Sequence, residues 1–295
     1  MDIWGKGDYQ ATLYVSKTRY NVSDFVRNNK KELWKIFLPL LPFILGLHVL
    51  DAVISDLYYS DGENRAGILG NLILNGEDTE GFFIGEMISG YFFVCLAISW
   101  HRLVIQGIDT YTPMKPFSPK KYELVFVGAW LLACVVSVLF TPFYALGMSY
   151  LLSMGVKIPE SEWLSFSLYI LLYFLMTYIF YRCCFYFPAK AVNAKITLKK
   201  AFSLSGGHLW RLFFVMFRTM FLWTFFFVAY VYIALLAYAG IHHYLQISSL
   251  EYVISLILYL PMVLYVEPIL IVLGVTALSN YYLYALQNEE RAVEG

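Results

Sequence analysis

The sequence predicts an all-α fold: a polytopic membrane protein of about six transmembrane helices, joined in places by short interfacial amphipathic helices. Two observations carry this prediction. Hydrophobic residues make up 60% of the 295 residues and charged residues only 14%, which excludes an ordinary soluble domain. The hydrophobic residues are also gathered into repeated long runs, and a bilayer core about 30 Å thick is crossed by roughly 20 helical residues.

The positive charges indicate which side of the membrane each loop faces. Eighteen of the 21 lysines and arginines fall in Lys6–Lys35, Arg102–Lys121, Arg182–Arg211 and at Arg291 in the tail. Short cytoplasmic loops retain cations, so we expect both termini in the cytoplasm. The same cations are expected to meet anionic lipid headgroups. Because the net charge is zero, nucleic acid is not expected as a partner.

The first 33 residues are expected to form a cytoplasmic arm followed by an interfacial helix. This short amphipathic helix is predicted to begin at Asn21, a good N-cap, with Asp24 near the exposed amides of the first turn. Val22, Phe25 and Val26 form its apolar side, because residues three and four apart share one face of a helix.

The transmembrane domain is expected over residues 34–288. Its spans are placed at about 34–55, 81–101, 122–148, 163–182, 210–240 and 252–286, before a cytoplasmic tail over 289–295. Ser118 and Pro119 are predicted to open the third helix, with the serine as cap and the proline in the first turn. The sequence leaves open whether the last apolar stretch is one long helix or is broken at Pro261 or Pro268.

A second interfacial helix is predicted over residues 197–205. Its apolar residues Leu198, Ala201 and Phe202 follow the i, i+3, i+4 spacing of a helix lying in the membrane plane. The helix is expected to stop at Gly206-Gly207, a pair that can adopt the left-handed C-cap geometry.

Similar five-residue segments follow the two predicted interfacial helices. Leu-Trp-Lys-Ile-Phe at residues 33–37 matches Leu-Trp-Arg-Leu-Phe at residues 209–213. One explanation is a parallel repeat of a surface helix plus a transmembrane hairpin. The other is that any helix leaving the cytoplasm needs a tryptophan and a cation at its start.

Two charged residues, Arg218 and Glu267, are expected deep in the membrane. Arg218 lies about 12 Å beyond Trp210 at the inner boundary, and Glu267 lies about 22 Å from the outer boundary at Tyr252, which is about 8 Å from the inner one. Since a charge in hydrocarbon costs about 2.5–3.5 kcal/mol, we expect a structural ion pair between the last two helices. The alternatives are an arginine that reaches the headgroups, and a proton or substrate site.

Two further clusters gather polar residues at the membrane boundaries. These are His48, Asp51 and Glu86 on the outer side, and His101, Arg102 and Arg182 on the inner side. The outer cluster offers ligands for a divalent cation, but a hydrogen-bonded His–Asp pair explains it equally well, so no metal is predicted. The inner cluster is explained by cations that extend from helix ends toward the headgroups.

Motifs of known catalytic and cofactor sites are absent from the sequence. It contains no HExxH, GxSxG, GxGxxG or phosphate-binding GxxxxGK[ST] pattern. The four cysteines lie in or beside apolar spans without the spacing of a disulfide framework or a zinc site. We therefore expect a protein without a cofactor and without enzymatic activity.

Ser-Trp-His-Arg at residues 99–102 and the stretch from Arg182 to Val192 resemble a bacterial family of six-helix inner-membrane proteins. The resemblance continues through Ala201 to residues 207–213 and covers mainly residues 95–215. Relatives are labelled after the membrane domain of glycerophosphodiester phosphodiesterases, and others are linked to envelope maintenance. The sequence contains no phosphodiesterase catalytic domain, so the resemblance implies the six-helix fold and not that activity.

The function expected from these features is that of an envelope-maintenance factor, or of an accessory or scaffold subunit packed against other membrane proteins. One alternative is a transporter or channel for a small solute or ion, which needs a polar path through the helices. A second is a lipid-headgroup-modifying enzyme, which needs paired polar residues at one headgroup level, such as the inner cluster.

Overall fold

The computed structural model describes residues 15–47, 49–50, 82–135, 178–206, 210–219 and 260–294, with further positions at 171, 174–175, 221, 225, 228–230 and 233. All regular elements within these residues are helices, which confirms the all-α class. Two of the described helices contain stretches long and apolar enough to cross a membrane, at Ile88–Gln106 and Val263–Glu289. The other four spans stay predictions.

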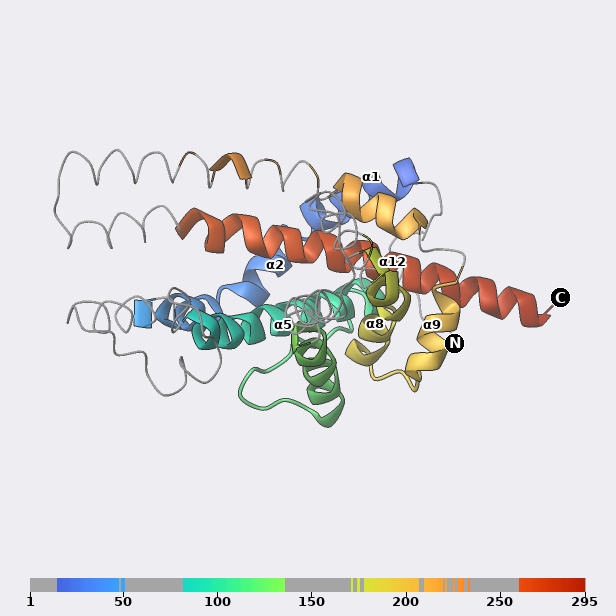
Figure 1. Ribbon diagram of the computed structural model, residues 1–295, viewed down its shortest axis with the longest axis horizontal. Helices are drawn as coiled ribbons and strands as arrows, with labels where there is room; N and C mark the ends of the chain where they lie inside the picture. The colour runs from blue at the N-terminus through green and yellow to red at the C-terminus, as the bar shows by residue number, and fades with distance from the viewer. Residues whose placement is uncertain are drawn as a thin grey trace, which may run out of the picture.

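Two long helices lie side by side through the middle of the molecule (Figure 1). They are α5 (Phe82–Gln106) and α12 (Glu267–Glu294). They pack together more extensively than any other two described elements. Trp100 contacts Thr276, and the next residue, His101, contacts Ser279. The two helices therefore run in the same direction, as expected of a second and a sixth span.

The N-terminal segment forms two short helices. They are α1 (Val15–Asn28) and α2 (Lys30–Phe37). α1 begins six residues before Asn21, so the predicted cap at Asn21 is wrong. The apolar side is confirmed, because Val22 and Val26 are buried and the ring of Phe25 packs edge-on against Trp100. α1 also packs against α12, and such packing outweighs the preference of one residue for a cap position.

The chain bends where the first predicted span begins. α2 ends at Phe37, residues 38–40 form a turn, and helical structure resumes at Leu41. Pro39 lies within this turn and Pro42 follows it; proline lacks an amide donor and disfavours helical geometry in the residue before it. The predicted span 34–55 is therefore not one continuous helix at its inner end.

The last apolar stretch contains a π-helix instead of a break. The segment η1 (Met262–Val266) leads directly into α12 and lies between Pro261 and Pro268, the two positions that the sequence left open. Pro268 has no amide to donate to the carbonyl of Leu264, and the wider π turn accommodates this missing bond. The helix therefore continues through both prolines, and it extends beyond the predicted end at residue 286 to residue 294.

Two short helices pack against the α5–α12 pair. They are α8 (Tyr186–Ala191) and α9 (Leu198–Leu204). The hydroxyl of Thr197 caps α9 by accepting the amide of Lys200 at 3.2 Å, which confirms a helix over the predicted residues. The predicted left-handed cap does not form at Gly206, because the positive φ angles among the described residues are at Gly107 and Asn193.

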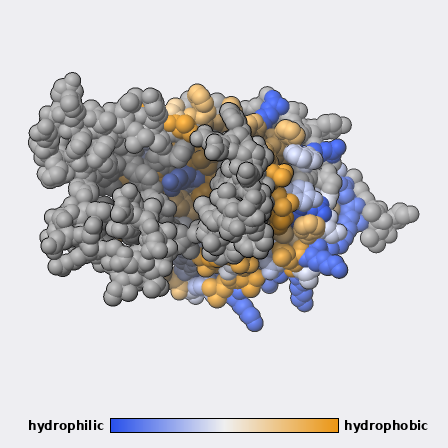
Figure 2. Space-filling model, viewed as in Figure 1, coloured by the Kyte–Doolittle hydropathy of each residue, from blue (hydrophilic) through white to orange (hydrophobic). Residues whose placement is uncertain are grey.

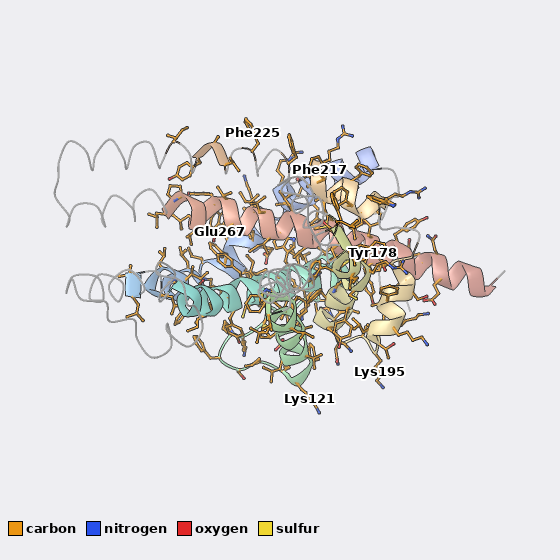
Figure 3. All side chains as sticks on the ribbon, viewed as in Figure 1. Lys121, Tyr178, Lys195, Phe217, Phe225 and Glu267 are labelled. Carbon is orange, nitrogen blue, oxygen red and sulfur yellow. The ribbon has the colours of Figure 1, made fainter. Side chains whose placement is uncertain are left out.

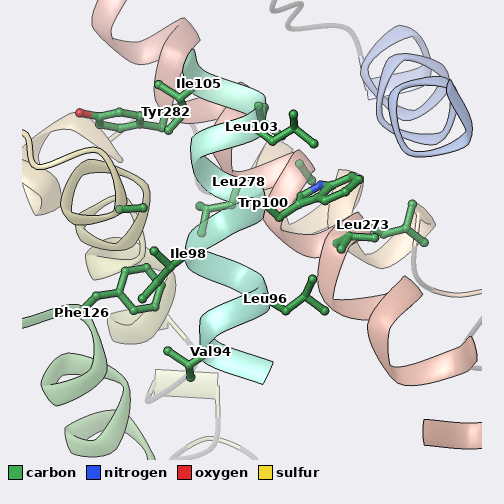
Figure 4. Packing of buried hydrophobic residues seen from close by; sticks show 14 of the residues in the cluster. Val94, Leu96, Ile98, Trp100, Leu103, Ile105, Phe126, Leu273, Leu278 and Tyr282 are labelled. Atoms are coloured by element: carbon green, nitrogen blue, oxygen red, sulfur yellow. The ribbon is translucent and has the colours of Figure 1, made fainter. Parts of the chain in front are cut away.

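The core lies between α5, α12 and the helical residues 121–135 (Figure 4). Leu96, Ile98 and Trp100 of α5 are fully buried there. Gly90 permits the close approach of residues 121–135, because a β-carbon at Gly90 would lie 2.9 Å from the ring of Trp130. Figure 2 shows that most described hydrophilic side chains gather at the end of the molecule that holds α9, and hydrophobic ones nearer the middle.

Candidate functional site

Five buried polar side chains lie near the C-terminal end of α5. They are Ser99, Trp100, His101, Arg102 and Glu123, each 2% exposed or less, and we call them the polar hub. Four of the five are consecutive residues of α5, so they point in different directions around the helix. Each reaches a different neighbour, and the polar hub thus joins elements that are distant in sequence.

Arg102 forms the buried ion pair of the hub. Its Nη2 lies 2.6 Å from Oε1 of Glu123, and the two side chains are 3% and 2% exposed. Its Nε donates to the carbonyl of Ala191 at 2.7 Å, and its Nη1 donates to the carbonyl of Thr112 at 3.1 Å. One guanidinium therefore holds the end of α8, the loop after α5 and the next helix, and the carbonyls help offset the cost of burying it.

Glu123 also sets the start of the helix over residues 121–135. Its Oε2 accepts the backbone amide of Lys120, while the carbonyl of Lys120 accepts the amides of Glu123 and Leu124. Lys120 is therefore the N-cap residue, and the predicted cap at Ser118 is wrong. The reason is that a glutamate at the third helical position can reach back to the cap amide, as in a capping box.

Trp100 and His101 fasten α5 to α12. The indole Nε1 of Trp100 donates to Oγ1 of Thr276 at 2.8 Å, and that hydroxyl donates to the carbonyl of Val272. Nδ1 of His101 lies 2.7 Å from Oγ of Ser279. Both contacts lie in a fully buried interface, where an unpaired polar group would cost about 1–3 kcal/mol.

Ser99 anchors the loop that follows α5. Its hydroxyl accepts the amide of Met114 at 2.9 Å and donates to the carbonyl of Cys95 at 2.7 Å. Nearby, the hydroxyl of Tyr91 donates to the carbonyl of Pro116. The loop is thus held against α5 by side-chain bonds to its backbone.

Arg182 was predicted to join His101 and Arg102 in an inner cluster, and its contacts lie elsewhere. Its guanidinium carbon is 4.2 Å from the ring centre of Phe202 in α9, and its carbonyl accepts the hydroxyl of Ser205 at 2.8 Å. Among the described contacts, Arg182 shares no partner with the other two residues. The predicted cluster therefore separates into the polar hub and a distinct contact with α9.

Asn280 is buried on α12 beside the polar hub. It is 1% exposed, and within the described part of the chain neither its amide nitrogen nor its oxygen has a hydrogen-bond partner. It directly follows Ser279 and lies one turn beyond Thr276, so three polar side chains fall within five residues of α12. Asn280 differs from the hub residues because no described element is bonded to its side chain.

The predicted ion pair of Arg218 with Glu267 is not among the ion pairs of the described side chains. Arg218 is exposed and makes no hydrogen bond or ion pair within the described part of the chain. Glu267 is half-buried at the first residue of α12 (Figure 3). Depth in the membrane was the ground for pairing them, and depth does not determine which way a side chain faces around its helix.

The outer cluster lies outside the described side chains. His48 and Asp51 are not among the described residues. Glu86 belongs to α5, but its side chain is not described. Within the described residues, no three His, Cys, Asp or Glu side chains gather as metal ligands would. The expectation of no metal stays a prediction.

Glu32 of α2 and Tyr111 of the loop after α5 form a hydrogen bond. The tyrosine hydroxyl donates to the carboxylate, and Lys35 lies 3.3 Å from the same oxygen. The bond from Tyr111 is the main reason why the pKa of Glu32 is lowered. Burial and the nearby carboxylate raise the pKa of Tyr111, so it stays protonated at neutral pH.

Replacing Tyr111 by phenylalanine is therefore expected to cost about 1–2 kcal/mol of stability at neutral pH. The pKa of Glu32 is lowered in the folded state, so its stabilisation is present above its unfolded pKa and is lost as the pH falls through the folded pKa. The free energy of unfolding of the natural protein and of Tyr111→Phe is measured in detergent between about pH 3 and pH 8. The difference between the two should be constant above about pH 5 and should shrink below about pH 4. A difference that does not change with pH would contradict this role of the Glu32 carboxylate.

Sequence reasoning missed three residues of this site: Glu123, Thr276 and Ser279. Glu123 has a detectable signal, because it is the last charge before the uncharged run from Leu124 to Val156. Thr276 and Ser279 lie three residues apart in a mostly apolar stretch, a spacing that places both on one face of a helix. Neither signal identifies the partner on the other helix.

Comparisons with protein-family models, curated proteins and solved structures found no match to this chain. The resemblance to the six-helix inner-membrane family therefore stays a prediction that rests on residues 95–215.

Proposed function

We propose that this chain is a non-enzymatic integral protein of a bacterial inner membrane, with both termini in the cytoplasm. It serves as an envelope-maintenance factor or as an accessory subunit packed against a larger membrane complex. The observation that supports this most is how the polar hub is used: every one of its polar side chains bonds to a neighbouring element. A catalytic group has to meet a substrate, and these groups are buried against the protein itself.

The surface of the molecule supports a membrane location. Large apolar side chains are exposed on the described parts of the predicted fourth and fifth spans, including Leu171, Phe174, Phe217 and Phe225, which are between 55% and 65% exposed. An exposed apolar surface of this extent suits hydrocarbon or an apolar partner. Three exposed lysines, Lys195, Lys199 and Lys200, lie on α9 or just before it, at the end of the molecule where the cytoplasm is expected.

The enzyme alternative has less support than the transporter alternative. A headgroup-modifying enzyme would use His101 and Arg102, which are both 2% exposed and already bonded. A transporter is favoured by one observation: Asn280 is an unpartnered buried amide beside Ser279, and unpartnered polar groups of this kind occur where a solute or ion passes. A substitution of Asn280 therefore distinguishes the transporter from the proposed non-transporting role.

Replacing Asn280 by leucine is expected to stabilise the protein by about 1 kcal/mol, because it removes an unpaired buried amide. Cells that carry this variant in place of the natural protein should keep an intact envelope. The control is Ser279→Ala at the adjacent position, which breaks a formed bond to His101 and should destabilise the protein by about 1 kcal/mol. If Asn280→Leu folds normally and the cells lose a solute flux or the envelope phenotype, the transporter is the better description.

A further inference from the structure

The helical segment that begins at Trp210 has one buried and one exposed face. Leu212 and Val215 are at most 1% exposed, and Thr219 is also buried. The opposite face carries Trp210, Phe214, Phe217, Phe221, Phe225 and Val228, each between 54% and 67% exposed. These six residues, spaced three or four apart, form one continuous strip that we call the aromatic strip. Figure 3 labels Phe217 and Phe225 on this segment.

Arg218 lies beside this strip. It is four residues after Phe214 and three before Phe221, so it is on the same side of the helix as both rings. It is exposed and has no partner within the described part of the chain. If the segment crosses the membrane, as the proposed function requires, a guanidinium among rings that face hydrocarbon needs an anion from outside the chain.

The direction of the helix indicates where this anion is. The side chains of an α-helix lean toward its N-terminus, and this helix begins at the inner boundary with Trp210 and Arg211. The side chain of Arg218 starts about 12 Å into the membrane and leans back toward the cytoplasm. Arg211 precedes it by seven residues on the same side, and it is also exposed. Both cations are thus directed toward the phosphates of the inner leaflet.

We propose that Arg218 binds the phosphate of an anionic phospholipid of the inner leaflet. The acyl chains of this lipid lie along Phe217 and Phe221, and Arg211 contributes a second cation at the headgroup. Arginine suits this role because its planar fork of donors matches a phosphate oxygen pair and cannot lose its charge in the membrane. The alternative occupant is a helix of a partner protein with an acidic residue at this depth.

The test is retention of phosphatidylglycerol by the purified full-length protein in neutral detergent, measured by native mass spectrometry. Arg218→Gln is expected to weaken retention about tenfold, the effect of losing one charge-assisted hydrogen bond. Arg218→Lys should recover part of the retention. The matched control is Lys121→Gln, which removes an exposed cation at the start of another helix and should leave retention unchanged. Equal retention by Arg218→Gln and the natural protein would overturn the proposal.

A photo-cross-linking amino acid at Phe221 in native membranes identifies the occupant. Transfer to lipid is expected, and a cross-linked protein would show that the strip faces a partner helix. Labelling of a cysteine at the same position by a water-soluble maleimide would show that the segment is not in the membrane. That result would contradict the proposed function as well, whereas loss of lipid retention alone would not.

Discussion

Replacing Arg102 by methionine is expected to destabilise the folded protein by about 3–5 kcal/mol, the cost of leaving a buried carboxylate without its counter-charge. The loss is large because the Arg102–Glu123 pair is almost fully excluded from solvent and also holds two backbone carbonyls. Unfolding of the detergent-solubilised protein, followed by circular dichroism, measures this loss.

Two variants distinguish the ion pair from a general effect of removing an arginine. Arg102→Met combined with Glu123→Gln should recover more than half of the loss, because no uncompensated charge remains and glutamine can still accept the amide of Lys120. Arg27→Met removes an exposed pair with Asp24 and should change stability by less than about 1 kcal/mol. A double variant as unstable as Arg102→Met alone would show that the ion pair is not the cause.

Replacing Trp100 by alanine is expected to cost about 3–5 kcal/mol. Trp100 is fully buried between α5 and α12, donates a hydrogen bond to Thr276, and lies edge-on to Phe25 of α1 with ring centres 6.1 Å apart. One substitution therefore removes packing among three helices.

The matched control is Trp210→Ala, at the tryptophan whose side chain is 67% exposed. It should change stability in detergent by less than about 1 kcal/mol. Trp100→Phe keeps most of the ring and loses the hydrogen bond, so its cost should be about 1–2 kcal/mol. Equal losses for Trp100→Ala and Trp210→Ala would contradict the buried role of Trp100.

Features that depend on local spacing could be predicted from the sequence. The helix over residues 197–205 is one example, since the apolar spacing and the Thr197 cap lie within its own nine residues. The apolar side of α1 was predicted for the same reason. The start of α1 could not be predicted in this way. It depends on the contact of α1 with α12, which joins segments more than 200 residues apart and leaves no local sequence pattern.

The partners of the polar hub could not be predicted for a related reason. Arg102 was recognised as a cation at a helix end, and its typical role there is to reach the headgroups. Its actual partner, Glu123, follows a loop whose path is fixed by Ser99 and Tyr91. A sequence shows where both charges stand along the chain, but not that the loop brings them together.

The direction in which Arg218 faces could be predicted only in part from the sequence. The pairing with Glu267 compared only their depths, whereas the strip of Phe214, Phe217 and Phe221 beside Arg218 is visible in the sequence. Large aromatic residues at this spacing fit either a buried face or a lipid-facing one. The structure shows that the aromatic face is exposed and that Leu212 and Val215 on the opposite face are buried.

The proposal that the polar hub serves folding and not chemistry is tested most directly in cells that carry only the double variant Arg102→Met with Glu123→Gln. The measurement is envelope integrity, read as growth in the presence of detergent, relative to cells with the natural protein and to cells lacking the gene. We expect growth equal to that with the natural protein, because the variant keeps the fold without the ion pair. A folded variant, present in the membrane at the natural amount, that grows no better than cells lacking the gene would contradict the proposal.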